Sequence, residues 1–332
     1  MKLFITGGAG FIGSNFVCYW LNKHSKDQIL VLDKLTYAGD LDNLKDVQNN
    51  PSYSFKQGDI CNKSLVKKLL LDFKPDVIVH FAAESHVTRS EFNKDIFYKT
   101  NILGTKNLLE NAKQAKIKKF IHISTDEVYG EIKRGYFKET DKRINDNKAT
   151  SDYAKSKAKA DDIAMKYSKL INVVVVRPTN NFGPKQYPEK ALPRWITNLI
   201  LNKKIEIWGD GKQIRDWLYV LDTCKALEII IKKGKSGNAY NIGANNKPEI
   251  ENIQAAKLLI KVMQKNENMI KLIPDPRKHH DFRYGVDTNK VSKLGWIPSK
   301  DIDRSFVDTV NWYKQNTKWW KKHKAEAEKI YK

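Results

Sequence analysis

Short apolar runs alternate with amphipathic segments through the first half of this 332-residue sequence. The apolar runs that we interpret as strands are 2–6, 29–33, 53–57, 77–81, 120–124 and 173–177. Segments with apolar residues at helical spacing lie between them, at 12–23, 64–73, 100–115 and 153–168. This alternation predicts an α/β fold built on a doubly wound parallel sheet, in which ligands bind at the carboxyl ends of the strands.

The sequence changes in character after residue 178, where prolines and glycines become frequent and the candidate strands become short. The length of the chain allows two domains. We therefore expect a cofactor-binding domain at 1–178 and a smaller α/β substrate-binding domain at 179–332. This division allows some segments of the second part to return to the first domain.

Cysteine and histidine content restricts the expected location and chemistry. Cys18, Cys61 and Cys224 are scattered and show neither a disulfide framework nor metal-ligand spacing, which predicts a reducing compartment such as the cytoplasm. No apolar run is long enough to span a bilayer, so no membrane association is expected. The histidines at 80, 86, 279 and 280 lack a third ligand at suitable spacing, and no metal site is predicted.

The formal net charge of +22 allows two interpretations. One is binding to nucleic acid or to an anionic membrane, and the other is a lysine-rich surface on a protein that binds small anions. The lysines are spread along the whole chain, which favours the second interpretation and predicts no nucleic-acid partner. The basic segment 319–324 is the best local candidate for an anionic partner, but a helix end anchored by Trp319 and Trp320 is favoured there.

A glycine motif between the first strand and the first helix predicts a dinucleotide site. Gly7, Gly10 and Gly13 would let the backbone approach a pyrophosphate placed on the helix N-terminus. Asp33 ends the second strand about 20 residues after Gly13, where a carboxylate accepts hydrogen bonds from a ribose diol, so NAD is favoured over NADP. Lys34 leaves some room for NADP. The remaining predicted cofactor contacts follow the glycines or end the third and fourth strands: Phe11, Ile12, Asp59, Ile60, Ala82 and Ala83.

Residues able to oxidise an alcohol and to eliminate water follow the strand 120–124. Tyr153 and Lys157 are four residues apart on one face of a helix, where an ammonium and the positive nicotinamide ring would lower the pKa of the phenol. Thr125 is placed to bind the same substrate hydroxyl. Asp126 and Glu127 supply a carboxylate to remove a proton and a carboxyl to expel hydroxide as water. Spacing equally allows one of these two to cap a helix and the other to be a solvated surface residue.

The motifs resemble those of the extended short-chain dehydrogenase/reductases, which have a Rossmann-type fold. Among these the chain is most similar to the nucleotide-sugar 4,6-dehydratases, those acting on dTDP-glucose in particular. The segments that carry the resemblance are 6–13, 80–87, 124–130, 153–157, 180–184, 188–190, 209–211, 214–220, 240–243 and 294–296. The carboxyl pair at 126–127 and the block at 215–217 are specific, whereas the glycine motif and the Tyr/Lys pair are shared with epimerases and decarboxylases.

The resemblance implies a role for each of these residues. Tyr153 takes the proton of the glucose 4-hydroxyl, supported by Lys157 and Thr125, while hydride passes from C4 to NAD⁺. Glu127 removes the C5 proton and Asp126 protonates the departing C6 hydroxyl. The hydride then returns to C6, so NAD is recycled and the product is a 4-keto-6-deoxy sugar for rhamnose or another deoxysugar pathway.

The resemblance also implies substrate contacts and an assembly. The residues at sugar-, phosphate- or base-contacting positions are Glu84, Ser85, Asn181, Lys190, Arg215, Asn246 and Arg277. Family members are commonly homodimers, which here would pair the helices near 100–115 and 153–168. Departures at Thr88 and at 278–282 bear on the choice of nucleotide base. UDP-glucose is therefore the alternative substrate, and a 4-epimerase, a decarboxylase or a basic nucleic-acid-binding protein are the alternative functions.

Overall fold

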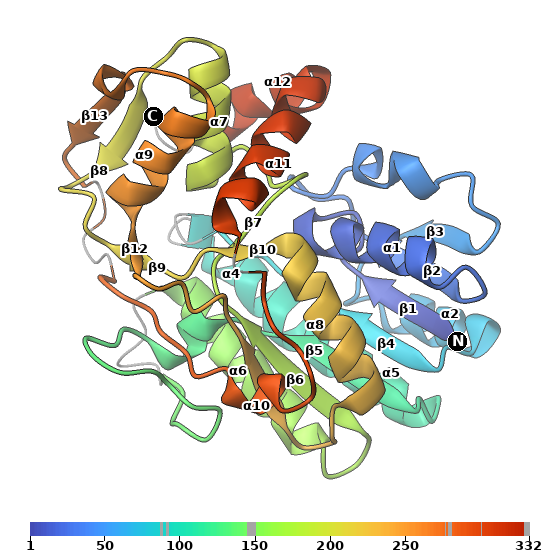
Figure 1. The fold of residues 1–332 in the computed structure, drawn as a ribbon. Helices are drawn as coiled ribbons and strands as arrows, with labels where there is room; N and C mark the ends of the chain where they lie inside the picture. The colour runs from blue at the N-terminus through green and yellow to red at the C-terminus, as the bar shows by residue number, and fades with distance from the viewer. Residues whose placement is uncertain are drawn as a thin grey trace.

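The computed structural model describes residues 1–86, 89–90, 93–144, 151–275, 277, 281–299 and 301–328. Within these residues seven parallel strands form the central sheet, in the order β11-β6-β5-β4-β1-β2-β3 (Figure 1). The strands are β1 Lys2–Thr6, β2 Gln28–Asp33, β3 Tyr53–Gln57, β4 Val77–His80, β5 Lys119–Ile123, β6 Val173–Pro178 and β11 Ala239–Ile242. The order reverses between β1 and β4, which marks the switch point where an open α/β sheet binds its ligand.

Helices cover both faces of the sheet, and for this reason the central strands are mostly apolar and buried, whereas the edge strand β3 alternates between polar and apolar residues. One face packs on α1 (Phe11–Lys23) and α8 (Val220–Lys233), for example through Ile5, Trp20 and Leu227. The other face packs on α2 (Lys63–Phe73), α5 (Thr105–Gln114) and α6 (Asp152–Tyr167). These two layers confirm the predicted doubly wound arrangement.

A smaller lobe with its own core stands at one end of the sheet (Figure 1). Its core packs Trp195, Leu259, Phe306 and Trp320 together. The elements of this lobe are α7 Ala191–Ile200, β8 Ile205–Trp208, α9 Asn252–Val262, η4 Glu267–Met269, β13 Ile270–Ile273, α11 Ile302–Gln315 and α12 Thr317–Glu328. In the lobe β8 and β13 pair in parallel.

Short elements connect the sheet to the lobe and shape the strand ends. The strands among them are β7 Asn181–Phe182, β9 Ile214–Arg215, β10 Leu218–Tyr219 and β12 Ile250–Glu251, and β7 pairs with β10 while β9 pairs with β12. The short helices are η1 Leu41–Val47, α4 Lys94–Phe97, η3 Asp126–Tyr129 and α10 Asn289–Ser292. The helix expected from residue 100 begins instead as a π-helical segment, η2 Tyr98–Gly104, that continues into α5.

The basic segment near the C-terminus lies within α12 in the lobe and not at the expected helix end, but its two tryptophans anchor it as the sequence favoured. Trp319 and Trp320 of α12 are buried, and the indole of Trp320 donates to the Tyr313 carbonyl. His323 and Lys322 contact Asp40, at 2.7 and 3.0 Å. Across the part of the chain that is described, no helix combines the length and the apolar character needed to cross a bilayer.

Candidate active site

A cleft opens at the carboxyl ends of β1, β2 and β4, and we call it the dinucleotide cleft. It contains every residue that the sequence assigned to the cofactor: Gly7, Gly10, Phe11, Ile12, Gly13, Asp33, Lys34, Asp59, Ile60, Ala82, Ala83, Tyr153 and Lys157. A second cavity, which we call the lobe cavity, adjoins it and shares Gln186, Glu189 and Lys190 with it. The two cavities thus form one continuous site between the sheet and the lobe.

The glycines of the first turn have different tasks. Gly7 has φ of +71°, and a Cβ there would lie 2.5 Å from the backbone nitrogen of Ala82. A Cβ at Gly13 would lie 2.3 Å from the Gly7 carbonyl oxygen. Among the described residues, a Cβ at Gly10 would approach that oxygen alone, at 3.4 Å, so Gly10 faces the cleft. This cradle at the start of α1 fits a pyrophosphate.

Asp33 lines the cleft and also hydrogen-bonds the glycine turn. Its Oδ2 accepts a hydrogen bond from the Ala9 amide at 2.9 Å, and its Oδ1 accepts one from the Leu35 amide at 2.8 Å. Burial raises the pKa of Asp33, and these backbone amides oppose that rise. Lys34 is the cation that would favour the 2′-phosphate of NADP. Its Nζ lies 2.9 Å from Asp59 Oδ2, so its charge is paired with a carboxylate.

Tyr153 and Lys157 lie on α6. Ser151 caps the start of this helix, because its side chain accepts a hydrogen bond from the Ala154 amide. The Nζ of Lys157 donates to the Ile123 carbonyl at 2.6 Å, at the end of β5, and burial lowers the pKa of Lys157 to about 8. Burial and the Glu127 carboxylate raise the pKa of Tyr153, while Thr125 lowers it. In the protein alone, burial and the carboxylates thus set the direction of the shift. The expected lowering of the phenol pKa, which includes the positive nicotinamide ring, stays a prediction for the site with the cofactor bound.

The carboxyl pair lies on η3, directly after β5. Thr125 caps this short helix, because its Oγ1 accepts a hydrogen bond from the Glu127 amide at 3.3 Å and donates to Asp126 Oδ1 at 3.1 Å. Asp126 is 3% exposed, and its Oδ2 has no hydrogen-bond partner among the described residues. The alternative of a capping residue beside a solvated one is therefore wrong, since Thr125 is the cap and Asp126 is buried.

The two carboxyl groups have different electrostatic surroundings. Burial and the neighbouring Glu127 raise the pKa of Asp126 to about 8, which keeps this group protonated near neutral pH. Burial also raises the pKa of Glu127, but Lys190 and Arg215 oppose that rise. The pKa of both carboxyls is raised, but two cations oppose the rise at Glu127, whereas Asp126 has a second carboxylate beside it. Environments that push two pKa values apart assign one group as acid and the other as base.

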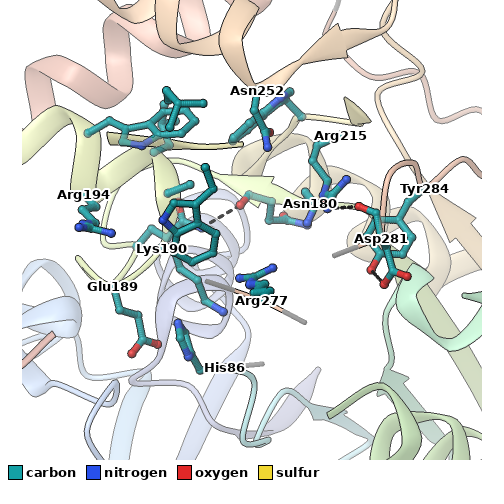
Figure 2. Close-up of a pocket in the computed structure, with 18 of the residues that line it drawn as sticks. His86, Asn180, Glu189, Lys190, Arg194, Arg215, Asn252, Arg277, Asp281 and Tyr284 are labelled. Atoms are coloured by element: carbon teal, nitrogen blue, oxygen red, sulfur yellow. Dashed lines mark hydrogen bonds between the residues drawn. The ribbon is translucent and has the colours of Figure 1, made fainter. Parts of the chain in front are cut away.

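Cations and aromatic rings surround the lobe cavity (Figure 2). Arg215 donates to the carbonyls of Ile214 and Asp281, both at 2.8 Å, and its guanidinium lies 4.8 Å from the centre of the Tyr284 ring. Arg277 lies 4.7 Å from the centre of the Trp208 ring, and in Figure 2 it is placed between Lys190 and Asp281. Guanidinium groups suit a diphosphate and flat rings suit a nucleotide base.

The structure brings most of the predicted substrate residues together. Asn181, Lys190, Arg215 and Arg277 line the lobe cavity, and Glu84 and Ser85 line the dinucleotide cleft. Asn246 lines neither cavity, because its amide donates to Asp216 Oδ1 at 3.1 Å and to the Trp217 carbonyl at 3.2 Å, behind Arg215. Thr88 and residues 278–280 lie outside the described residues.

Sequence reasoning missed several residues of the lobe cavity. The clearest are Trp195, Trp208, Asn252 and Tyr284. Trp208 directly precedes the Gly-Asp-Gly segment that formed part of the resemblance, so that motif contained a usable signal. The segment around Tyr284 carries no comparable motif, and only the fold brings it to the cavity. Within the described ranges, no group of three or more potential metal ligands is present.

Comparison with known proteins gives consistent matches along the chain. The family model described as GDP-mannose 4,6 dehydratase matches residues 4–309. A protein from Streptomyces niveus named dTDP-glucose 4,6-dehydratase is 40% identical over 335 residues, which cover 99% of this chain and 97% of that protein.

Solved structures match the fold equally well. The dTDP-glucose 4,6-dehydratase of Bacillus anthracis, crystallised with NAD, has a TM-score of 0.89 at 40% identity and covers 97% of this chain and 99% of its own. The enzyme DesIV from Streptomyces venezuelae, a dTDP-glucose 4,6-dehydratase with NAD and dTDP bound, has a TM-score of 0.91 at 37% identity, with coverages of 97% and 100%.

Proposed function

The chain belongs to the GDP-mannose 4,6-dehydratase family, and we propose that it is an NAD-dependent dTDP-glucose 4,6-dehydratase. This hydro-lyase converts dTDP-D-glucose to dTDP-4-keto-6-deoxy-D-glucose and water. The observation that carries the proposal is the carboxyl pair of buried Asp126 and half-buried Glu127, the second of which lines the lobe cavity. A simple epimerase has no use for an acid and a base at this position. The names of the relatives, and NAD in two neighbouring structures, support the same conclusion.

The oxidation step belongs to α6 and the end of β5. NAD, when bound, accepts a hydride from C4 of the sugar and later returns it to C6. Tyr153 receives the proton of the C4 hydroxyl, and Thr125 hydrogen-bonds the same hydroxyl. Lys157, held by the Ile123 carbonyl, supplies the nearby positive charge. The protein alone raises the pKa of Tyr153, which keeps the phenol protonated. The phenol therefore acts as a base only when the positive nicotinamide ring lies in the cleft and lowers its pKa.

The elimination step belongs to η3. Oxidation at C4 makes the C5 proton acidic, and Glu127 removes it as general base. Asp126, protonated near neutral pH because its pKa is about 8, gives its proton to the C6 hydroxyl as it leaves as water. After reduction at C6, Glu127 returns the proton to C5. Tyr153 has then gained the proton of the C4 hydroxyl and Asp126 has lost one, so proton transfer from Tyr153 to Asp126 through solvent closes the balance. The two carboxyls therefore act in opposite protonation states, and the cations of Lys190 and Arg215 beside Glu127 support its role as the base.

The substrate lies across both cavities. Arg215, Lys190 and Arg277 grip the diphosphate in the lobe cavity. The sugar lies near Glu84, Ser85 and Asn181, toward the Tyr153 side. Asn246 supports this end of the site indirectly, by holding Asp216 and the carbonyl of Trp217.

Product analysis by mass spectrometry tests the proposal. Purified protein is incubated with dTDP-glucose or UDP-glucose and catalytic NAD. We expect loss of one water without net accumulation of NADH, and a faster reaction with dTDP-glucose. The bases differ by one methyl group, worth about 1–3 kcal/mol in a pocket, so the rate ratio identifies the base. Product of unchanged mass would overturn the dehydratase and favour an epimerase.

We also propose a homodimer through the helices near 100–115 and 153–168. Tyr98 and Leu103, which precede α5 on the same side of the sheet, are 53% and 44% exposed, and pairing would cover such apolar surface. Light scattering after size-exclusion chromatography measures the mass directly. A monomer at micromolar concentration would contradict the dimer.

The remaining proposals concern location and domains. We propose that the protein works in the cytoplasm, since Cys18, Cys61 and Cys224 are free thiols in the described structure. We also keep the division into a cofactor-binding part at 1–178 and a substrate-binding part at 179–332. The pairing of β11 with β6 supports the return of one later segment to the first domain.

A further inference from the structure

A charged pair lies fully buried beneath the candidate active site. The Nε and Nη2 of Arg177, at the end of β6, donate to the two carboxylate oxygens of Asp161 at 2.8 and 2.9 Å. Both side chains are 0% exposed, and Asp161 lies on α6. Removing two charges from water costs about as much free energy as their attraction returns, so such a pair is weak support for stability alone. Its position suggests another role.

Tyr129 connects this pair to a second part of the fold. Its hydroxyl accepts a hydrogen bond from Arg177 Nη1 and donates one to Asn241 Oδ1 at 2.8 Å. The Tyr129 ring also stacks on Phe137, with ring centres 5.1 Å apart. The amide group of Asn241 donates in turn to the Phe137 carbonyl at 3.1 Å. The hydroxyl is therefore fixed from several directions.

The network contacts both elements that hold the proposed catalytic residues, η3 at one end and α6 at the other. Tyr129 is the last residue of η3, the four-residue helix that holds Asp126 and Glu127. Asp161 is four residues after Lys157 on α6, the helix that also holds Tyr153. A four-residue 3₁₀ helix has few hydrogen bonds of its own, so contacts at its end decide where its side chains lie. The network thus connects the oxidation residues to the elimination residues.

We propose that Tyr129, Arg177 and Asp161 are positioning residues that fix the carboxyl pair Asp126–Glu127 relative to Tyr153 and Lys157. This inference rests on the proposed function, because it assigns the network to one step of that reaction. Water elimination needs the acid and the base at opposite ends of the C5–C6 bond, and small displacements are costly in such a geometry. Proton removal by Tyr153 involves α6 and Thr125 at the start of η3, and it depends less on Tyr129 at the end of η3.

The test is the Tyr129→Phe variant, which removes the hydroxyl and keeps the ring on Phe137. We expect NAD content and KM for dTDP-glucose to stay near those of the wild type. Steady-state formation of the keto sugar should fall about ten-fold or more, as expected for a displaced acid–base pair. Because oxidation continues while elimination slows, absorbance of the reduced cofactor at 340 nm should build up on the enzyme with substrate. A merely structural role would not produce this signal.

Tyr240→Phe is the matched control. Tyr240 is also buried, on β11, and its hydroxyl accepts one hydrogen bond, from the Lys235 amide at 3.2 Å. The inference is overturned if Tyr129→Phe behaves like this control, or if oxidation and elimination fall in equal proportion. A wild-type protein that does not dehydrate the substrate would instead refute the proposed function, so the two failures are distinguishable.

Discussion

Asp126 and Glu127 are neighbours in the chain, yet they differ in the charges around them. Asp126 is buried beside a carboxylate, whereas cations of Lys190 and Arg215 act on Glu127. The sequence placed both residues at a strand end and identified them as an acid–base candidate. It did not predict which was which from the residues themselves, because Lys190 and Arg215 come from segments more than 60 positions away in the chain.

The raised pKa of Asp126 has a consequence for stability that can be measured. The folded protein keeps this proton up to a pH of about 8, whereas the unfolded chain loses it near pH 4. The folded state therefore binds the extra proton over this interval, and stability must fall as pH rises through it. The Asp126→Asn variant carries an amide that stays neutral at every pH, so it should escape this loss.

We therefore predict that Asp126→Asn is inactive in dehydration but more stable than the wild type. The loss of a general acid lowers the rate by about 10²–10⁴-fold. In thermal unfolding with the same NAD content, the variant's advantage in melting temperature should grow from pH 5 to pH 8 and then level off. Full dehydratase activity in this variant would refute the acid role, and an advantage independent of pH would refute the buried proton.

The turn between β1 and α1 separates two effects of glycine. Gly13 and Gly7 have backbone atoms where a Cβ would stand, and those atoms cannot move aside. Gly10 instead faces the dinucleotide cleft. Substitutions at Gly10 and Gly13 therefore distinguish the need for close packing from the need for room beside a ligand.

We predict that Gly10→Ala folds with a melting temperature close to the wild type when both lack NAD, but binds NAD at least about ten-fold more weakly. Gly13→Ala, in contrast, should be strongly destabilised, because its Cβ would lie 2.3 Å from a carbonyl oxygen. Calorimetric titration with NAD and thermal unfolding of both variants measure the two effects. Tight NAD binding by Gly10→Ala would contradict the placement of the pyrophosphate.

At the level of elements, periodicity predicted the first half of the fold well. All six expected strands are present with their ends displaced by at most one residue. Five of them are largely buried apolar runs, and β3 at the edge of the sheet instead alternates between apolar and polar residues. Less could be predicted where tertiary packing decides. The π-helical start at Tyr98–Gly104 has no sequence signature, and β11 is a four-residue segment that pairs with a strand more than 60 positions earlier.

At the scale of the whole molecule, the smaller lobe contacts the sheet domain beside the dinucleotide cleft. Asp40 lies in the loop whose residues Ala38 and Gly39 line the cleft, and its amide donates to the Ala9 carbonyl at 3.1 Å. The Asp40 carboxylate accepts hydrogen bonds from Lys322 and His323 of α12, which belongs to the smaller lobe. Burial would raise the pKa of Asp40, but the Asp42 amide and these side chains together lower it. These contacts connect α12 to the loop that lines the dinucleotide cleft.

We predict that Asp40→Asn releases NAD faster and lowers stability at neutral pH by about 1 kcal/mol, a figure reduced for screening because Lys322 is 59% exposed. Asparagine still caps η1, so the variant tests the charge.

A lowered carboxyl pKa adds stability above the unfolded pKa, and this stability is lost as the pH falls through the folded value. The deficit should therefore shrink below about pH 4. Asp42→Asn is the control, since this side chain is 60% exposed and lies 3.5 Å from Lys322. Equal NAD release from both variants would show that the contact between lobes does not hold the cofactor loop.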